Sequence, residues 1–132
     1  PEERLALRAF LARGGLLFAD DNYGLAESFR AEMDTLFPGR PLRPLAVSHP
    51  VFRSHHVFPR GLPKIHEHDG KPPAAYGIEL DGRLVVLFTH ETDLGNGWED
   101  PAVHGVPPAL REAALRMGVN VYAWFLQGAP AR

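Results

Sequence analysis

Two short, continuous apolar runs constrain the fold of this chain more than any other feature of its sequence. The first is LLFAD at positions 16–20, which follows Gly14-Gly15, and the second is RLVVLFT at positions 83–89. A strand with one wet face alternates apolar and polar residues, whereas an unbroken apolar run of this length is typical of a strand covered on both faces. We therefore expect a sheet layered with helices.

Three helical patterns accompany these runs. The first covers positions 2–13 and ends at Gly14-Gly15, and the second covers positions 26–37 and ends at Pro38-Gly39. The third is long and amphipathic and opens at Pro107-Pro108. Proline is favoured in the first turn of a helix, and glycine is favoured directly after the last turn. These residues therefore mark the ends of the first two helices and the start of the third.

The strands are expected to form a mixed sheet. AAYGIEL and RLVVLFT are joined by Asp81-Gly82, which is a strong signal for a two-residue hairpin turn, and a short strand fits within positions 42–47. The predicted fold class is α/β, with a layered sheet of about four strands flanked by three helices. The chain starts at Pro1 without a methionine, so we expect one domain over positions 1–132 that is a fragment of a longer protein, with its sheet incomplete at the N-terminal side.

Composition excludes several classes of function. The chain has 14 basic and 16 acidic residues without a basic cluster, which argues against a nucleic acid partner. It has no cysteine, so cysteine nucleophiles and thiolate metal sites are excluded, and no serine lies in the GxSxG elbow of a hydrolase. No apolar run approaches the ~18 residues that span a bilayer, so we expect no membrane span in this chain.

The densest polar stretch, THETDLGNGWED at positions 89–100, directly follows the second apolar run. Ligands of open α/β sheets bind beyond the carboxyl ends of parallel strands, and both apolar runs end in polar residues. If the two strands are parallel neighbours, these side chains converge on one ligand site, to which a Gly-Asn-Gly turn could add backbone amides. The candidate ligand-binding residues are Asp20, Asp21, His90, Asp93, Asn96 and Trp98. In the alternative interpretation the aspartates cap a following helix or turn and the tryptophan closes the core.

A second candidate site is a divalent metal site in the loop before the hairpin. Positions 38–73 hold eight of the thirteen prolines and five of the seven histidines, so most of this stretch is expected to be irregular. His66 and His68 would point to the same side of an extended segment and could ligate zinc. Alternatively they are solvated loop residues. For His49, which precedes Pro50, a role in capping a turn or starting a helix is as good an explanation as a role as a ligand.

The last helix carries more aromatic residues than one apolar stripe needs. Tyr122, Trp124 and Phe125 lie close together, so part of this helix could face another chain or upstream strands. Packing in the core of the domain is the alternative.

The chain resembles a bacterial family called domain of unknown function 4159. The segments that carry the resemblance are LRAFLARGGLLFADD, SFRAEMDTLFPGRPLRPL, HPVF, YGIELDGRLVVLFTHETDLGNGWE and ALRMGVNVYAWFL. The resemblance implies a fold similar to class I glutamine amidotransferases and flavodoxin-like proteins, usually with further strands upstream. It also implies that no activity is established for the family, whose members are often predicted to be exported or membrane-associated. Glutamine hydrolysis by a cysteine nucleophile is excluded because the chain has no cysteine.

The sequence thus favours a non-catalytic module that binds a small molecule or a protein partner. One alternative is a metal-dependent hydrolase, in which histidine and carboxylate ligands hold an ion that activates water. Another is an interaction or scaffold domain of an envelope-associated protein, with a periplasmic or membrane-associated location.

Overall fold

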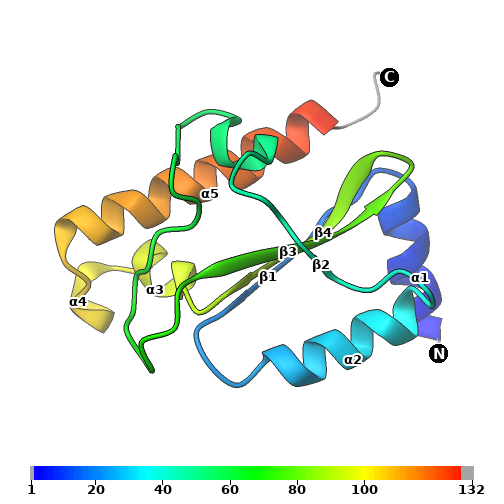
Figure 1. Cartoon of the computed structure of the whole chain (residues 1–132), viewed down its shortest axis with the longest axis horizontal. Helices are drawn as coiled ribbons and strands as arrows, with labels where there is room; N and C mark the ends of the chain where they lie inside the picture. Colours follow the sequence, from blue (N-terminus) through cyan, green and yellow to red (C-terminus); the bar gives the residue numbers. More distant parts are fainter. Residues whose placement is uncertain (1, 129–132) are drawn as a thin grey trace.

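A computed structural model of the chain describes residues 2–128 (Figure 1). The helices are α1 (Glu2–Ala12), α2 (Ala26–Leu36), α3 (Leu94–Trp98), α4 (Pro101–His104), α5 (Pro108–Gly128) and the 3-10 helix η1 (Pro50–Arg53). The strands are β1 (Leu17–Asp21), β2 (Arg43–Pro44), β3 (Ala74–Leu80) and β4 (Arg83–His90). The three predicted helices are therefore present, and α3, α4 and η1 are additional short helices.

The four strands form one mixed sheet in the order β1-β4-β3-β2, which confirms the predicted fold class. β1 runs parallel to β4, with Asp21 opposite His90, while β3 is antiparallel to both β4 and β2. The hairpin between β3 and β4 turns at Asp81 and Gly82, whose φ values of 52° and 77° fit the expected two-residue turn.

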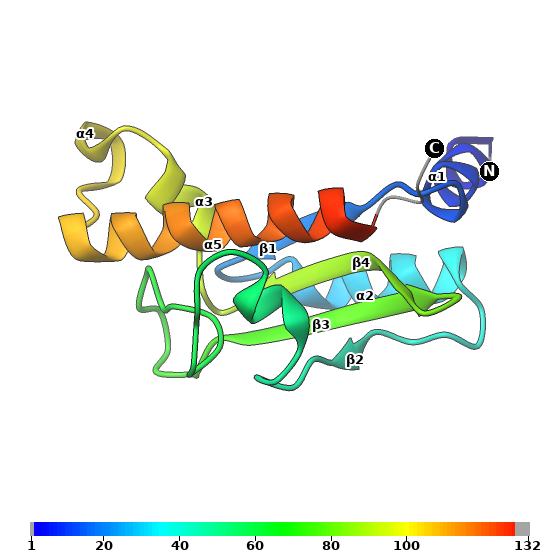
Figure 2. The same ribbon diagram turned by 90° about the horizontal axis from the view of Figure 1, so that it is seen from above.

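Helices cover both faces of the sheet (Figures 1 and 2). On one face, Met117 and Val121 of α5 and Leu94 of α3 pack against Leu87 of β4. On the other face, residues of α1 and α2 pack against Phe88 of β4. β4 supplies buried side chains to both cores, as its unbroken apolar run predicts.

The other apolar run is less buried than its sequence indicates. LLFAD suggests a strand covered on both faces, but only Asp21 of β1 is buried and its other four residues are half-buried. The reason is position: β1 is an edge strand that pairs with β4 alone among the described strands.

The expected Gly-Asn-Gly turn is instead part of the short helix α3. A Cβ atom added to Gly97 would lie 2.3 Å from the Cβ of Ala114 in α5, so glycine allows the two helices to touch. We attribute the helical conformation of Leu94–Trp98 to this close packing against α5.

The proline-rich loop at positions 38–73 is held against α5 by the buried side chain of Asn120. Asn120 accepts a hydrogen bond from the amide of His56 at 2.7 Å and donates to the carbonyls of Val51 at 3.0 Å and His56 at 2.8 Å. His49 begins η1, because its Nδ1 accepts from the amide of Val51 at 3.2 Å, which confirms the helix-start role.

Across residues 2–128, no helix is both long and apolar enough to pass through a lipid bilayer.

Candidate functional site

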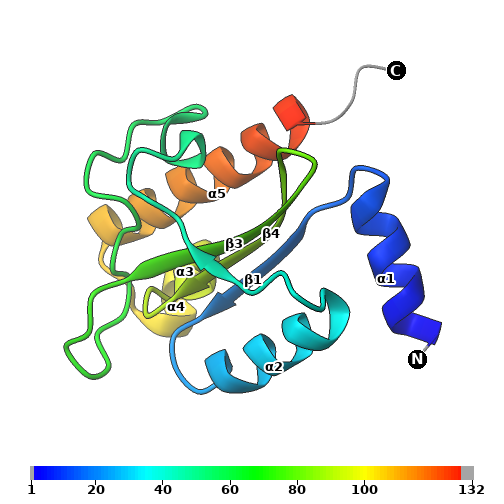
Figure 3. The same cartoon turned by 45° about the vertical axis from the view of Figure 1, so that its right-hand side comes forward.

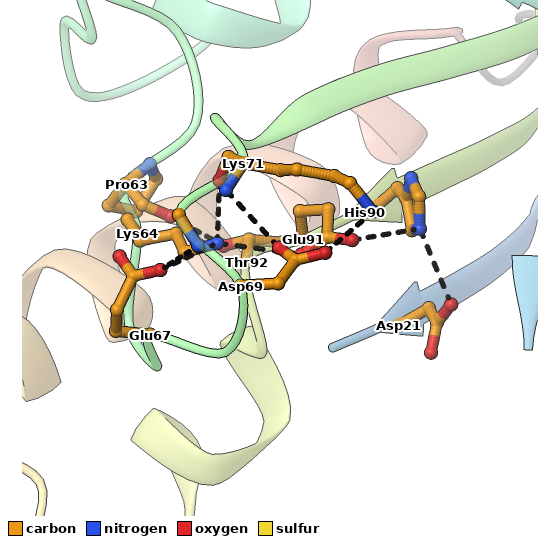
Figure 4. Close-up of polar contacts among 10 residues, drawn as sticks. Asp21, Pro63, Lys64, Glu67, Asp69, Lys71, His90, Glu91 and Thr92 are labelled. Carbon is orange, nitrogen blue, oxygen red and sulfur yellow. Dashed lines mark hydrogen bonds and ion pairs between the residues drawn. The ribbon is translucent and has the colours of Figure 1, made fainter. Parts of the chain in front are cut away.

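The carboxyl ends of β1 and β4 meet at one end of the sheet, because the two strands are parallel neighbours. The Nε2 atom of His90 lies 3.7 Å from Oδ2 of Asp21 and 3.6 Å from Oε1 of Glu91 (Figure 4). The loop before β3 brings two lysines and an aspartate to the same place. We call this polar cluster, together with Asn22, which follows Asp21 in the chain, the β1–β4 rim; its other members are Asp21, Lys64, Asp69, Lys71, His90 and Glu91.

Glu91 is the most unusual residue of the rim. Its side chain ends in a carboxyl group, yet the residue is only 3% exposed. Its Oε2 atom lies 3.5 Å from Nζ of Lys64 but accepts no hydrogen bond within the described structure. Its backbone has a φ of 59°, in the left-handed region that glutamate rarely adopts. Glu91 is therefore buried, strained and incompletely paired.

Two lysines and Asp69 close the rim from the loop side. Nζ of Lys71 contacts Oδ2 of Asp69 at 2.6 Å, and this hydrogen bond raises the pKa of the lysine and lowers that of the aspartate. Nζ of Lys64 donates to the carbonyl of Lys71 at 2.7 Å. The loop is held in place by the hydroxyl of Thr92, which donates to the carbonyl of Pro63 (Figure 4).

The adjacent aspartates of β1 both act as helix-start acceptors. Oδ2 of Asp21 accepts from two amides at the start of α2, each at 3.1 Å. Asp20 accepts from the hydroxyl of Thr89 at 2.6 Å and from the amide of Gly95 at 2.9 Å. Burial raises the pKa of Asp20, although these hydrogen bonds oppose the shift. The Gly95 amide that was expected to face a ligand therefore binds Asp20.

The remaining predicted residues contact other groups. The side chain of Asn96 donates to the carboxylate of Asp93. Nε1 of Trp98 donates to the carbonyl of Ala114 at 2.8 Å, and its ring lies 5.7 Å from the ring of Phe18. Trp98 thus contacts β1 and α5, but it is 37% exposed and so does not close the core fully.

The predicted histidine pair lies in the exposed part of the loop. His66 and His68 are both exposed, and the ring of His68 lies 4.0 Å from that of Tyr23. Within residues 2–128, no three histidine, aspartate or glutamate side chains gather in an arrangement that could hold a metal ion.

The ligand-binding residues predicted from the sequence did not include Glu91, Lys64, Asp69 or Lys71. Their meeting depends on the path of the loop, which carries the lysines across the strand ends. The available signal was the position of Glu91, next to the last residue of β4 and directly after His90.

A broad concavity of about 800 Å³ lies elsewhere, at the β2–β3 edge, and is lined in part by Arg40, Arg43, His49 and Glu79. Its arginines are exposed. No buried polar side-chain atom of the described structure is left without a hydrogen bond there, since both such atoms, on Asn22 and Glu91, belong to the rim. The rim is therefore a stronger candidate for a binding site than this concavity.

A family model described as Domain of unknown function (DUF4159) matches residues 1–126. Among curated proteins, none matches the chain.

Proposed function

The chain belongs to the DUF4159 family, and from that premise we propose that it is a binding module that holds a small molecule at the β1–β4 rim without transforming it. The observation that carries this proposal is the Oε2 atom of buried Glu91, which has an ion pair with Lys64 at 3.5 Å but no hydrogen bond within the described structure. Ligands of α/β sheets bind beyond the carboxyl ends of parallel strands, and Glu91 directly follows such an end.

The energetic cost of Glu91 supports a role in binding. A left-handed backbone at a residue other than glycine costs about 1–3 kcal/mol. A buried polar group without a hydrogen bond costs about 1–3 kcal/mol more. Asparagine or glycine at this position would avoid most of the strain, but would lose the ion pair between Oε2 and Nζ of Lys64 at 3.5 Å. A ligand that donates a hydrogen bond to Oε2 gives a further reason for a glutamate.

The unfilled atoms define the chemistry of the ligand. Oε2 of Glu91 and Oδ1 of Asn22 are both buried acceptors without a hydrogen bond in the described structure, although Nζ of Lys64 lies 3.5 Å from Oε2. A complementary ligand must therefore donate hydrogen bonds through an amine, a guanidinium or hydroxyl groups. Tyr23, 66% exposed beside His68, offers a flat apolar surface next to these acceptors. We infer a donor-rich organic molecule that is neutral or cationic.

The alternative functions have less support. A metal-dependent hydrolase would rest on His66 and His68, which are exposed and belong to no ligand group of three within residues 2–128.

The flavodoxin-like or amidotransferase-like fold is part of the proposal. The parallel β1–β4 pair fits such a sheet, whereas the antiparallel β3 departs from an all-parallel one.

Chemical-shift mapping by NMR tests the location of the site. The labelled protein is titrated with arginine, putrescine and glucose as donor probes, and with inorganic phosphate as an acceptor-rich anion. We expect at least one donor probe to give saturable shifts at the amides of residues 20–23, 64–71 and 90–92. Phosphate should not saturate these amides.

Glu67→Gln is the matched control for Glu91→Gln. Glu67 also lies near Lys64, at 4.0 Å, but its side chain is exposed. Saturable shifts should vanish in Glu91→Gln and persist in Glu67→Gln. The proposal fails if no donor probe saturates, or if both variants bind like the wild type.

A further inference from the structure

We propose that residues 67–71 form a lid over the β1–β4 rim, which lifts to admit the ligand and closes again over Glu91. We call these five residues the rim lid. The inference rests on the proposed function, because it describes how a ligand reaches that site. It is carried by the burial of Glu91, by the exposure of the lid and by the few contacts that hold the lid in place.

The acceptor that the ligand must reach is closed off from solvent. Glu91 is only 3% exposed, and its Oε2 atom is buried. Figure 4 shows Asp69 and Lys71 beside Glu91, and both side chains interact with its carboxyl group. A hydrogen bond needs donor and acceptor atoms roughly 3 Å apart. A ligand atom bound to Oε2 therefore needs space that the lid and Lys64 now fill.

The rim lid has little packing against the rest of the protein. Residues 66–72 are all exposed, whereas Ile65, directly before them, is buried. A Cβ atom added to Gly70 would meet no atom within 4 Å, so the tip of the lid lies in open space. Figure 3 shows this green segment projecting past the end of the sheet at which β1 leads into α2. Segments with few buried contacts are those that open at the lowest cost in free energy.

The hydrogen bonds of the lid run mostly within the lid itself. The amide of Gly70 donates to Oε1 of Glu67 at 2.6 Å, and the amide of Lys71 donates to Oδ1 of Asp69 at 3.2 Å. Nζ of Lys71 lies 2.6 Å from Oδ2 of Asp69. None of these contacts has to break when the lid lifts, so the lid can move as one unit about its ends.

The chain directly before the lid is anchored at Thr92. The amides of Ile65 and His66 donate to the carbonyl of Thr92 at 2.9 and 3.2 Å, and the hydroxyl of Thr92 donates to the carbonyl of Pro63. Lys64 lies between these anchored residues. It therefore stays at the rim while the lid moves.

Lys64 is the first of two residues that hold the lid closed. Among the hydrogen bonds and ion pairs within residues 2–128, those that join the lid to the rest of the chain all come from Lys64. Its Nζ donates to the carbonyl of Lys71 at 2.7 Å and lies 4.0 Å from Oε1 of Glu67. The same Nζ lies 3.5 Å from Oε2 of Glu91. A donor group that binds Oε2 competes with this ammonium group, which couples ligand binding to the release of the lid.

Tyr23 is the second residue that holds the lid closed. Its ring lies 4.0 Å from the ring of His68, and Tyr23 follows Asn22 at the end of β1. The closed lid therefore covers the flat apolar surface that Tyr23 offers beside the unfilled acceptors. Lifting the lid uncovers this surface together with Oε2 of Glu91.

Thiol alkylation tests the lid without any ligand. The chain has no cysteine, so Glu91→Cys places a single thiol beneath the lid, and its reaction with iodoacetamide reports how often the lid is open. Adding Tyr23→Ala should speed alkylation about two- to tenfold, the factor that corresponds to one aromatic pair. Tyr122→Ala is the matched control, because Tyr122 is 64% exposed and Tyr23 is 66% exposed. It should leave the rate unchanged. Equal rates in the Tyr23→Ala and Tyr122→Ala proteins would contradict the lid.

Cross-linking tests the lid in binding. In Tyr23→Cys/His68→Cys, a short bis-maleimide joins the lid to the β1–α2 connection, and the same variant capped with N-ethylmaleimide is the control. Arginine, putrescine and glucose are titrated into both proteins by NMR. A probe that binds the capped protein should bind the cross-linked protein at least about tenfold more weakly, because the lid cannot lift. Equal affinities would overturn the lid and leave the proposed function standing.

The two experiments separate a failure of the lid from a failure of the proposed function. If none of the three probes binds either the wild type or the capped protein, the proposed ligand site is wrong. Alkylation of the thiol at position 91 then still decides whether residues 67–71 open. Faster alkylation with Tyr23→Ala alone supports the lid in that case, and an unchanged rate refutes it.

Discussion

At the scale of single residues, the buried polar side chains divide into two kinds. Asn120, Thr89 and Thr92 have their hydrogen bonds satisfied by the backbone or by neighbouring side chains, and they hold loops and strands in place. Glu91 and Asn22 each keep a buried acceptor atom without a hydrogen bond in the described structure. The first kind is explained by folding alone. The second kind is concentrated at the rim, which is why the rim carries the functional proposal.

Asn120 should be critical for stability. Asn120→Ala removes three hydrogen bonds and leaves the amide and carbonyl of His56 without partners. We expect a loss of about 2–4 kcal/mol in the free energy of unfolding, measured by urea denaturation. Gln127→Ala removes an exposed hydrogen bond from α5 to Ser54 and should cost under ~0.5 kcal/mol. Similar losses in the two variants would refute this role for Asn120.

Asp20 should make stability depend on pH in a defined direction. Burial raises its pKa from the ordinary 3.8, so the folded state holds this proton more tightly than the unfolded state. The stability that Asp20 contributes is therefore fully present below its pKa in the unfolded state. It is lost as pH rises through the pKa of Asp20 in the folded state. In Asp20→Asn this loss is absent, so the variant should gain stability relative to wild type as pH rises from about 3.5 to 7. Urea denaturation at several pH values measures the difference, and a constant or shrinking difference would contradict the assignment.

At the scale of elements, α3 connects the rim to α5. Its first turn gives an amide to Asp20, and Gly97 lets it touch Ala114. Gly118 of α5 lies close to the Trp98 ring at the other end of α3. Small residues at these contacts set how closely α3 approaches α5, and through α3 they fix where the segment after β4 runs.

Gly97→Ala should separate α3 from α5. The new Cβ would lie 2.3 Å from that of Ala114, so the variant should lose about 1–3 kcal/mol in the free energy of unfolding. Gly95→Ala is the matched control on the same helix. Its Cβ would meet only Asp20 Oδ2, at 3.6 Å, and alanine favours a helix, so stability should stay equal or rise by up to ~1 kcal/mol. Ala114→Gly should restore much of the loss in Gly97→Ala. A Gly97→Ala variant as stable as wild type would contradict this contact.

Elements with strong local signals were predictable from sequence, and those set by distant contacts were not. α1, α2, α5 and the β3–β4 hairpin follow from apolar periodicity, glycine stops and the Asp81-Gly82 turn. α3 was missed because its helical turn depends on docking against α5 rather than on its own sequence. The approach of Asp21 to His90 was predictable from parallel strand ends, while Lys64 reaches Glu91 only through the path of an irregular loop.

At the scale of the whole molecule, the sheet has two cores, one blunted edge and one open edge. β4 is buried in its centre, and the rim lies where it and β1 end. The open edge and the rim belong to the same strand, β1, which carries Asp20 and Asp21.

The most direct test of the central claim is the affinity of the rim for a donor probe, measured by isothermal titration calorimetry on wild type, Glu91→Gln and Glu67→Gln. If the free oxygen of Glu91 accepts from the ligand, Glu91→Gln should bind at least about tenfold more weakly, a loss of ~1.4 kcal/mol or more. Glu67→Gln should bind within about twofold of wild type, because that side chain is exposed. Equal affinities for wild type and Glu91→Gln would contradict the account.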